Sequence, residues 1–480
     1  MSRITIGSQQ SPTAADRVAA ALDEVRIIVR IAPGLDPIAA AAAGALVSMV
    51  SRIHHHVELD GDAALAPNPW GATQLSGVLD AVASHRPDSA AEYRSDLVLV
   101  VGDAAGDIGI GGDDWTVRVG EPSPAAASRF GFGLQAAAAF GASEALKVAL
   151  KPIGMVAVSA RFEWDLLTHA YGRTDPPDGT GIVGDVIFAG AGSVNSSAAA
   201  VLMPAPPGRR AIVVDPDTFD VIKNPYRYPA ARAATNGAKA PWVAGMLAEA
   251  GWIASGVPID IATWVQTQIN PGFDGTIVSS VDSVPGRADV ADVLARTTLS
   301  AGVEALALHV QREHSFDTYA CPNCDFADVG APITQAQVYA DATGIELHRI
   351  AALIDGDVIN DADVDAVARS GKLPSADGLL GRRLADVIAR VYAEATVPVG
   401  AVPVRVSAPF VSWMAGTLLA VEISKPGIGA AQIDRRIDLD MAGVPTGAVG
   451  RRLRNEVGHC ACASPWRRRA TSSMAATQAA

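Results

Sequence analysis

One stretch, residues 185–198, constrains the fold of this chain more than any other. It reads Asp185-Val-Ile-Phe-Ala-Gly-Ala-Gly-Ser-Val-Asn-Ser-Ser-Ala198. Four apolar residues without alternation, Val186 to Ala189, are typical of a parallel strand that is covered on both faces. Gly190 and Gly192 then allow a tight turn and a close approach of the backbone to phosphate, and the following helix presents free N–H groups to an anion. The stretch therefore predicts a nucleotide site, although a glycine turn can also be only a sharp strand–helix connection.

Length and charge narrow the class of protein. The chain has 480 residues, which suggests two or three domains, and a net charge of −13. That acidic balance argues against a nucleic-acid partner. The apolar runs at 38–50 and 410–423 are too short to span a membrane, and the start shows no secretory signal. We therefore expect a cytoplasmic α/β protein with no membrane association.

The first 180 residues predict an α/β domain with little chemistry of its own. Residues 96–102 read as a strand ending at a glycine, and residues 131–150 as a long helix of small residues. Residues 106–112 predict a flexible, acidic loop that would repel phosphate. The histidines 54–56 favour a helix C-terminus over a metal site, because adjacent helical residues point in different directions.

The second half carries polar residues after successive strands. A carboxylate pair ends an apolar strand, an Asn and an Arg share the next loop, a Lys begins the next helix, and an Asp ends a later strand. In chain order these residues are Asp215, Asp217, Asn224, Arg227, Lys239 and Asp282. Ligands bind at the carboxyl ends of parallel strands, so joint placement at one edge is expected. There, two cations would neutralise phosphates, Asp215 would bind a ribose, and Asp282 would hold Mg²⁺ or orient the lysine.

These residues resemble the ATP-dependent adenylyltransferases of the ThiF/MoeB/HesA group, which belong to the ubiquitin-activating-enzyme-like superfamily. The matching motifs are Gly190-Ala-Gly192, Asp215-Pro-Asp217, Asn224-Pro-Tyr-Arg227, Lys239 and Asp282. Residues 409–425 resemble the late helix that closes the family's adenylation domain. The resemblance covers about 181–325 and 400–465. Asn195 stands where the family has a glycine, and Tyr228 where it has a glutamine.

The resemblance implies an α/β fold of tandem Rossmann-like domains. The first, residues 1–180, would be degenerate; the second, residues 181–465, would be a ThiF-like adenylation domain with a helical insert at about 331–395, followed by a disordered tail at 466–480. By resemblance, Arg227, Lys239 and Asp282 are catalytic. The implied ATP and Mg²⁺ site comprises Gly190, Gly192, Asn195, Asp215, Asp217, Asn224, Arg227, Lys239 and Asp282.

The four cysteines form two close pairs far apart in sequence. Cys321 and Cys324 are one pair, and Cys460 and Cys462 are the other. Their spacing favours a structural Zn²⁺ site over a redox pair or unrelated thiols, and the resemblance also implies a zinc clasp. If all four bind zinc, none remains to receive an acyl group as a thioester.

The family's acceptor is usually the C-terminal carboxylate of a small ubiquitin-like or sulfur-carrier protein, and sometimes of a peptide. The resemblance therefore implies adenylation of such a carboxylate with release of pyrophosphate. It also implies a homodimer or an intramolecular pseudo-dimer, in which an arginine of the first half, such as Arg161 or Arg173, reaches the phosphates. Alternatives are a peptide-modifying enzyme of natural-product assembly, a tRNA-modifying relative, and a non-catalytic scaffold with the same fold.

Overall fold

The computed structural model describes most of the chain up to residue 450. The described ranges are 12–87, 92–153, 161–179, 181–221, 224–268, 272–281, 284–313, 324, 335–354, 356–371, 376–384, 387, 407–433, 436–445 and 449–450. They fall into two compact units, one containing both β-sheets and the other containing three short helices within Val329–Pro403. The boundary expected at residue 180 lies within the first unit and stays a prediction.

The first sheet has seven strands in the order β2-β1-β3-β4-β5-β6-β7, parallel as far as β4 and antiparallel beyond it. Its strands are β1 (Val25–Ile31), β2 (Val57–Asp60), β3 (Ser95–Val101), β4 (Ile108–Gly112), β5 (Thr116–Gly120), β6 (Phe162–Asp165) and β7 (Ala170–Tyr171). The α-helices of this half are α2 (Pro12–Asp23), α3 (Pro37–Ser51), α4 (Leu75–Ala81) and α5 (Phe132–Leu150).

The second sheet has eight strands in the order β10-β9-β8-β11-β12-β13-β14-β15, parallel from β10 to β12 and antiparallel beyond it. Its strands are β8 (Asp185–Ala189), β9 (Arg210–Val214), β10 (Ile253–Val257), β11 (Phe273–Ser279), β12 (Ala295–Glu304), β13 (Ala307–Glu313), β14 (Arg436–Asp440) and β15 (Val449–Gly450). Its α-helices are α6 (Ser193–Leu202), α7 (Lys239–Glu249), α8 (Ile261–Gln266), α9 (Val284–Asp292) and α14 (Pro409–Ser424). An α/β fold with two mixed sheets is therefore confirmed.

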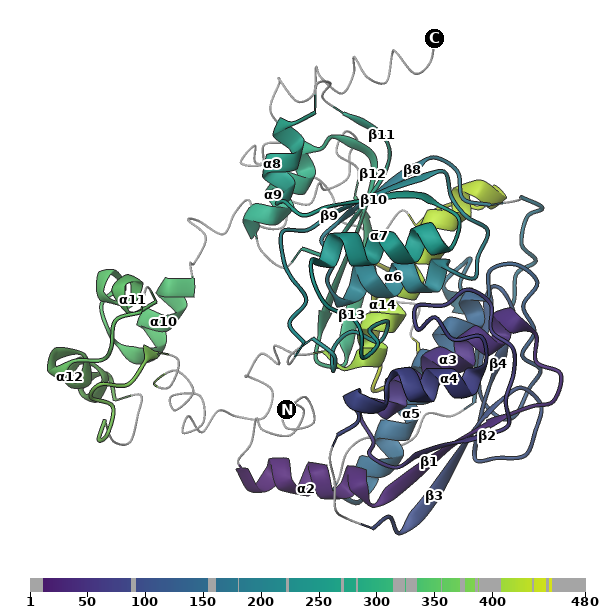
Figure 1. The fold of residues 1–480 in the computed structure, drawn as a ribbon, viewed down its shortest axis with the longest axis horizontal. Helices are drawn as coiled ribbons and strands as arrows, with labels where there is room; N and C mark the ends of the chain where they lie inside the picture. The colour runs from purple at the N-terminus through teal and green to yellow at the C-terminus, as the bar shows by residue number, and fades with distance from the viewer. Residues whose placement is uncertain are drawn as a thin grey trace. The chain divides into compact units, whose positions relative to one another are not determined.

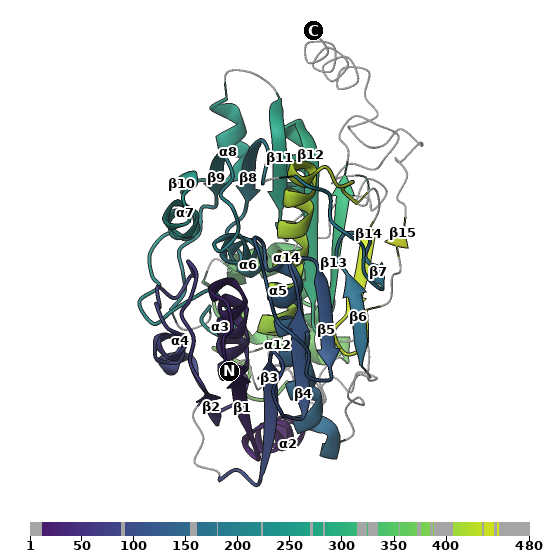
Figure 2. The ribbon, with the colours of Figure 1, turned by 90° about the vertical axis from the view of Figure 1, so that its right-hand side faces the viewer.

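Helices of both halves pack together between the sheets (Figure 1, Figure 2). Helix α5 contacts α3, β4 and β5 on one side, and α14 contacts α6, β12 and β13 on the other, with α5 and α14 in contact with each other. Every residue of α14 is buried, as expected for a helix that is apolar all round. A Cβ at Gly416 would lie 2.6 Å from the backbone nitrogen of Ala198, so glycine is required where α14 crosses α6.

The expected flexible loop at residues 106–112 is wrong in its second half, because Ile108–Gly112 forms the buried strand β4. A Cβ at Gly109 would lie 2.1 Å from the carbonyl oxygen of Glu121, and one at Gly111 would lie 2.2 Å from Ser123 Oγ. These glycines therefore permit the close approach of residues 121–124 to the strand, and do not make the segment flexible.

The second unit contains α10 (Gln335–Thr343), α11 (Leu347–Ile354) and α12 (Asp361–Ser370), within the range expected for a helical insert. Asn360 and Asp363 form a capping box at the start of α12. The unit has a core of its own, which includes Ala340, Ile345, Ile350, Leu353, Ile359, Val367, Leu379, Leu384 and Val387. In the described part of the chain, no helix combines the length and apolar character needed to cross a membrane.

His85 is expected to make the stability of the fold depend on pH. Burial, and then the charge of Arg52, lower the pKa of His85 to about 4, from 6.5 for an unperturbed histidine. Between pH 6.5 and 4, His85 is protonated in the unfolded chain but neutral in the folded chain. The free energy of unfolding therefore falls as the pH falls from 6.5 to 4. Over this pH range, we expect the free energy of unfolding of the His85→Asn variant to fall by about 2 kcal/mol less than that of the wild type.

Urea denaturation of both proteins at pH 7 and pH 4 measures this difference. Two other buried histidines, His54 and His169, are present in both proteins, so their contributions cancel. Equal losses of stability in the two proteins would contradict the assignment to His85.

Candidate nucleotide site

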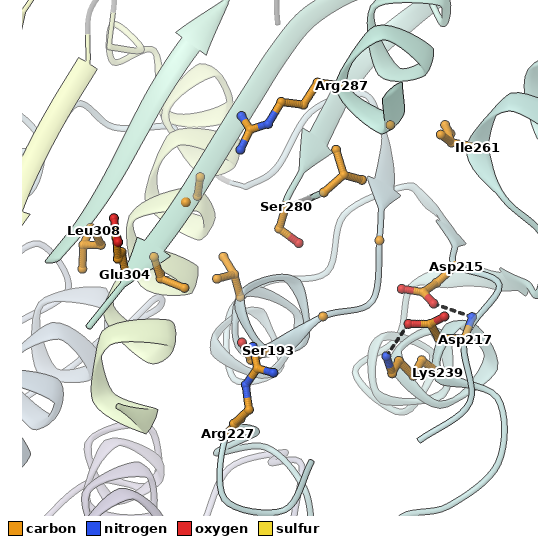
Figure 3. A pocket seen from close by; sticks show the side chains of 18 of the residues that line it. Ser193, Asp215, Asp217, Arg227, Lys239, Ile261, Ser280, Arg287, Glu304 and Leu308 are labelled. Atoms are coloured by element: carbon orange, nitrogen blue, oxygen red, sulfur yellow. Dashed lines mark hydrogen bonds and ion pairs between the residues drawn. The ribbon is translucent and has the colours of Figure 1, made fainter. Parts of the chain in front are cut away.

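A cavity of about 900 Å³ opens at the carboxyl ends of the parallel strands of the second sheet. β8 lies between β9 and β11. The connection that follows β8 runs toward β9 on one side, and the connection that follows β11 runs toward β12 on the other, so the strand order reverses between β8 and β11. Open α/β sheets bind ligands at such a switch point. Figure 3 shows Asp215, Asp217 and Lys239 on one side of the cavity and Glu304 and Leu308 on the other.

The glycine turn after β8 forms one wall of the cavity. Gly190 has φ +88°, a conformation that favours glycine, and its N–H donates to the carbonyl of Val214 over 2.8 Å. A Cβ at Gly190 would lie 3.6 Å from Ser280 Oγ, and a Cβ at Gly192 would lie 3.9 Å from the same atom. Each Cβ would therefore make only ordinary van der Waals contact. Both glycines line the cavity, and Gly192 is the N-cap residue of α6. The turn thus leaves room for an anion at a helix N-terminus.

Asp215 fastens this turn to the end of β9. One carboxylate oxygen accepts the N–H of Ala191 over 2.5 Å, and the other accepts the N–H of Asp217 over 2.8 Å. Burial raises the pKa of Asp215, and these two hydrogen bonds oppose the rise. The carboxylate lines the cavity and has oxygen lone pairs beyond those two bonds, so it can also accept a ligand hydroxyl.

Lys239 is nearly buried and bonded to the second carboxylate. Its Nζ donates to Asp217 over 2.7 Å, and its residue begins α7. Burial lowers the pKa of Lys239, but the hydrogen bond to Asp217 and the charges of Tyr228 and Asp215 together raise it, and the net shift is upward. Lys239 is therefore a fixed cation in the cavity wall at neutral pH.

Two polar atoms of the cavity wall lack hydrogen-bond partners among the described residues. Both Arg227 Nε and Ser280 Oγ are buried and unpaired. A buried donor without a partner costs about 1–3 kcal/mol, so these atoms indicate where a ligand would bond. Arg227 and Ser193, which is in the first turn of α6, both line the cavity and are labelled in Figure 3. A charged guanidinium, open glycines and a volume within the usual range for ligand pockets fit a nucleotide phosphate.

Seven of the nine residues expected at the ATP site line this cavity: Gly190, Gly192, Asp215, Asp217, Asn224, Arg227 and Lys239. Asn224 also accepts the N–H of Asp220 over 2.8 Å, which shapes the loop that carries Arg227. Asp282 lies outside the described residues, but its sequence neighbours Val281 and Pro285 line the cavity.

Asn195 lies beneath the turn and does not line the cavity. Its amide donates to the carbonyls of Ala189, Gly190 and Val278 over 3.1, 2.7 and 3.3 Å, and the residue is fully buried. The Asn195 side chain therefore bonds the turn to β11.

Replacing Asn195 by the glycine of the family pattern is expected to reduce the free energy of unfolding by about 2–3 kcal/mol. The substitution removes the amide from three carbonyls and adds a helical glycine. Ser196→Gly is the control, since within the described ranges the Ser196 hydroxyl bonds only to the nearby Ser193 carbonyl, and it should cost about 1 kcal/mol. Urea denaturation measures both; an equal loss in the two variants would contradict the role of the amide.

Sequence reasoning missed the far side of the cavity. Its polar residues come from α9, β12, β13 and β14 and are Arg287, Asp289, Glu304, His309, Arg436 and Asp438. Arg287 lies eight residues after the end of β11, within α9, so the search of strand ends that found Asp282 did not reach it. The sequences of β12 and β14 carry no such signal. These strands are far apart in the chain, and both contribute to the cavity because each pairs with β13.

The arginines expected to reach from the first half do not line the cavity. Arg161 pairs with Glu121, and Arg173 lies 3.8 Å from Asp113. Arg52, in contrast, bonds to the loop that carries Arg227, with its Nε donating to the carbonyl of Pro225 over 2.8 Å.

The structure does not test the metal sites. Cys321, Cys460 and Cys462 lie outside the described residues, and Cys324 is buried. Within the described ranges, no group of three or more His, Cys, Asp or Glu side chains is placed to hold a metal ion. Zn²⁺ and Mg²⁺ therefore remain predictions.

Solved structures of E. coli MccB are distant matches to the chain. No protein-family model and no curated protein matches the chain. A crystal structure of E. coli MccB matches with a TM-score of 0.32 and 11% identity, over 58% of this chain and 65% of that one. MccB with ATP gives 0.28 and 11% over 58% and 66%, and MccB with succinimide gives 0.29 and 10% over 69% and 73%. The chain thus spans less than two thirds of the first structure.

Proposed function

We propose that this protein is an ATP-dependent adenylyltransferase that activates a carboxylate. The observation that carries the proposal is the convergence of Arg227, Lys239 and Asp215 around an open glycine turn at the switch point of a parallel sheet. Cations beside a helix N-terminus suit phosphates, and a buried carboxylate suits a ribose hydroxyl.

Each residue then has a role in binding ATP. Gly190 and Gly192 admit the phosphates, Arg227 and Lys239 neutralise their charge, and Asp215 binds the ribose. Asp282 is proposed as the ligand of Mg²⁺. The supporting contacts are the unpaired Arg227 Nε and the position of Lys239, which its bond to Asp217 fixes in the cavity wall.

The reaction follows from the chemistry of the groups. An oxygen of the acceptor carboxylate bonds to the α-phosphorus of ATP, and the bond from that phosphorus to the bridging oxygen breaks. The products are an acyl-adenylate and pyrophosphate. Arg227 and Lys239 offset the negative charge that develops on the phosphate oxygens in this step. A carboxylate that is already ionised needs no general base, so catalysis consists of positioning and charge stabilisation.

The acceptor proposed first is the C-terminal carboxylate of a small ubiquitin-like or sulfur-carrier protein. A peptide C-terminus is the alternative within the same chemistry. The zinc clasp of Cys321, Cys324, Cys460 and Cys462 is also proposed, and with it a reaction that ends at the adenylate without a cysteine thioester.

Mass spectrometry tests the proposal on the acceptor itself. Small proteins and peptides encoded beside this gene are incubated with the protein, ATP and Mg²⁺, and each is examined for the mass of an added AMP. The proposal expects an adduct that requires ATP and a free C-terminal carboxylate, and that is lost when the carboxylate is amidated. An adduct that survives amidation would overturn carboxylate activation.

A further inference from the structure

The first half of the chain forms several hydrogen bonds with the loop that follows β9. This loop, residues 224–233, carries Asn224, Arg227 and Tyr228, which line the cavity. From the first half, Ser48 Oγ donates to the Pro229 carbonyl over 2.7 Å, and Trp70 Nε1 donates to the same oxygen over 3.2 Å.

Two further bonds hold the end of the same loop. The Ala233 N–H donates to the carbonyl of Ala81 over 3.0 Å, and Arg232 Nη1 donates to the carbonyl of Trp70 over 3.2 Å. The loop is therefore bonded to α3, α4 and the segment between them, and not only to its own sheet.

Arg52 is the centre of this contact. It follows α3, is 1% exposed, and uses all five of its N–H donors. Nε donates to Pro225 O over 2.8 Å, Nη1 to Ser48 O over 3.1 Å and to Ser48 Oγ over 2.8 Å, and Nη2 to Ala231 O and, over 3.2 Å, to His85 Nδ1. A buried guanidinium is costly unless its donors are paired, so the positions of these carbonyls are tightly defined.

The two loop carbonyls that Arg52 bonds, those of Pro225 and Ala231, lie on either side of Arg227 in the sequence. Between them, the N–H groups of Arg227 and Tyr228 both bond to the Asn224 carbonyl, over 2.9 and 3.1 Å. The backbone that carries Arg227 is thus fixed at both ends by one side chain of the first half. Arg227 itself enters the cavity with its Nε unpaired.

We infer that the first half positions the nucleotide site of the second half, with Arg52 as the positioning residue that sets Arg227 for phosphate. The inference rests on the proposed function, since it requires that the cavity binds ATP. It assigns the first half a role within the same chain that does not require any of its side chains to touch the nucleotide.

The test measures the dissociation constant of ATP, with Mg²⁺, by calorimetry on the full chain. Arg52→Met removes the guanidinium and keeps much of the side-chain volume. We expect this variant to bind ATP about tenfold or more weakly, because Arg227 would be misplaced. Trp70→Phe removes one bond to Pro229 and should weaken binding by about two- to fivefold; it serves if Arg52→Met does not fold.

Gln135→Leu is the matched control. It breaks the buried 3.1 Å bond from Trp413 Nε1 to Gln135 Oε1, which also joins the two halves and makes no bond to the loop. Trp413 stacks on Trp70, but the bond from Trp70 to Pro229 and all the bonds of Arg52 remain in this variant. We expect this variant to lose thermal stability and to bind ATP as the wild type does.

A double-mutant cycle separates positioning from general stability. If Arg52 acts through Arg227, Arg52→Met should change ATP affinity less than twofold once Arg227 is already alanine. An equal effect of Arg52→Met in both backgrounds, or an equal loss of affinity in Gln135→Leu, would overturn the positioning role. Failure of the wild type to bind ATP would instead overturn the proposed function.

Discussion

Replacing Lys239 by alanine is expected to lower the rate of ATP–pyrophosphate exchange by about 10²–10³-fold. Its ammonium is the fixed cation of the cavity wall, and removing one preorganised group that stabilises developing charge costs about 3 kcal/mol. The fold should tolerate the change, since the partner carboxylate of Asp217 is 65% exposed and ion pairs with an exposed partner contribute about 0–1 kcal/mol.

Arg210→Ala is the control for this prediction. Arg210 begins β9 and pairs over 2.7 Å with Asp185, which begins β8, so the pair lies at the ends of these strands away from the cavity. Its loss changes the net charge by the same amount as the loss of Lys239. Exchange should remain at the wild-type rate in that variant. Equal rates in Lys239→Ala and Arg210→Ala would contradict the role of Lys239.

Gly192→Val is expected to weaken ATP binding by about 100-fold or more and to leave the fold intact. The backbone of Gly192 has φ −67° and ψ −178°, which valine adopts without strain. Its Cβ would enter the cavity 3.9 Å from Ser280 Oγ, so the branched side chain would occupy the space proposed for the phosphates.

Calorimetry with ATP and Mg²⁺ measures the loss, and thermal unfolding checks the fold. Gly245→Val in α7 is the matched control, because a Cβ there meets no atom within 4 Å and the residue does not line the cavity. It should bind ATP normally. Wild-type affinity in Gly192→Val would mean that ATP does not bind against this turn.

The near side of the cavity could be predicted from the sequence because its determinants are local. An unbroken apolar run, a glycine turn and the position of Asp215 or Lys239 relative to its own strand or helix are read within a few residues. Parallel pairing then brings such strand ends to one edge, which is why seven of the expected residues meet in the structure.

The features that sequence reasoning missed depend on partners far away in the chain. The Asn195 amide bonds to Val278, 83 residues away, and the carbonyls bound by Arg52 lie 173 and 179 residues away. Likewise, the glycines of β4 read as a loop because the segment that packs on them follows only after a second strand. Composition near Arg52 gives no sign that its donors all have buried acceptors.

ATP–pyrophosphate exchange tests the central claim most directly. The purified protein, with Mg²⁺, is assayed with and without each candidate acceptor encoded nearby, alongside Lys239→Ala. The proposal predicts exchange that depends on one acceptor's C-terminal carboxylate and is lost in the variant. Exchange that proceeds equally in Lys239→Ala, or no exchange and no ATP binding with any acceptor, would contradict it and favour a non-catalytic scaffold.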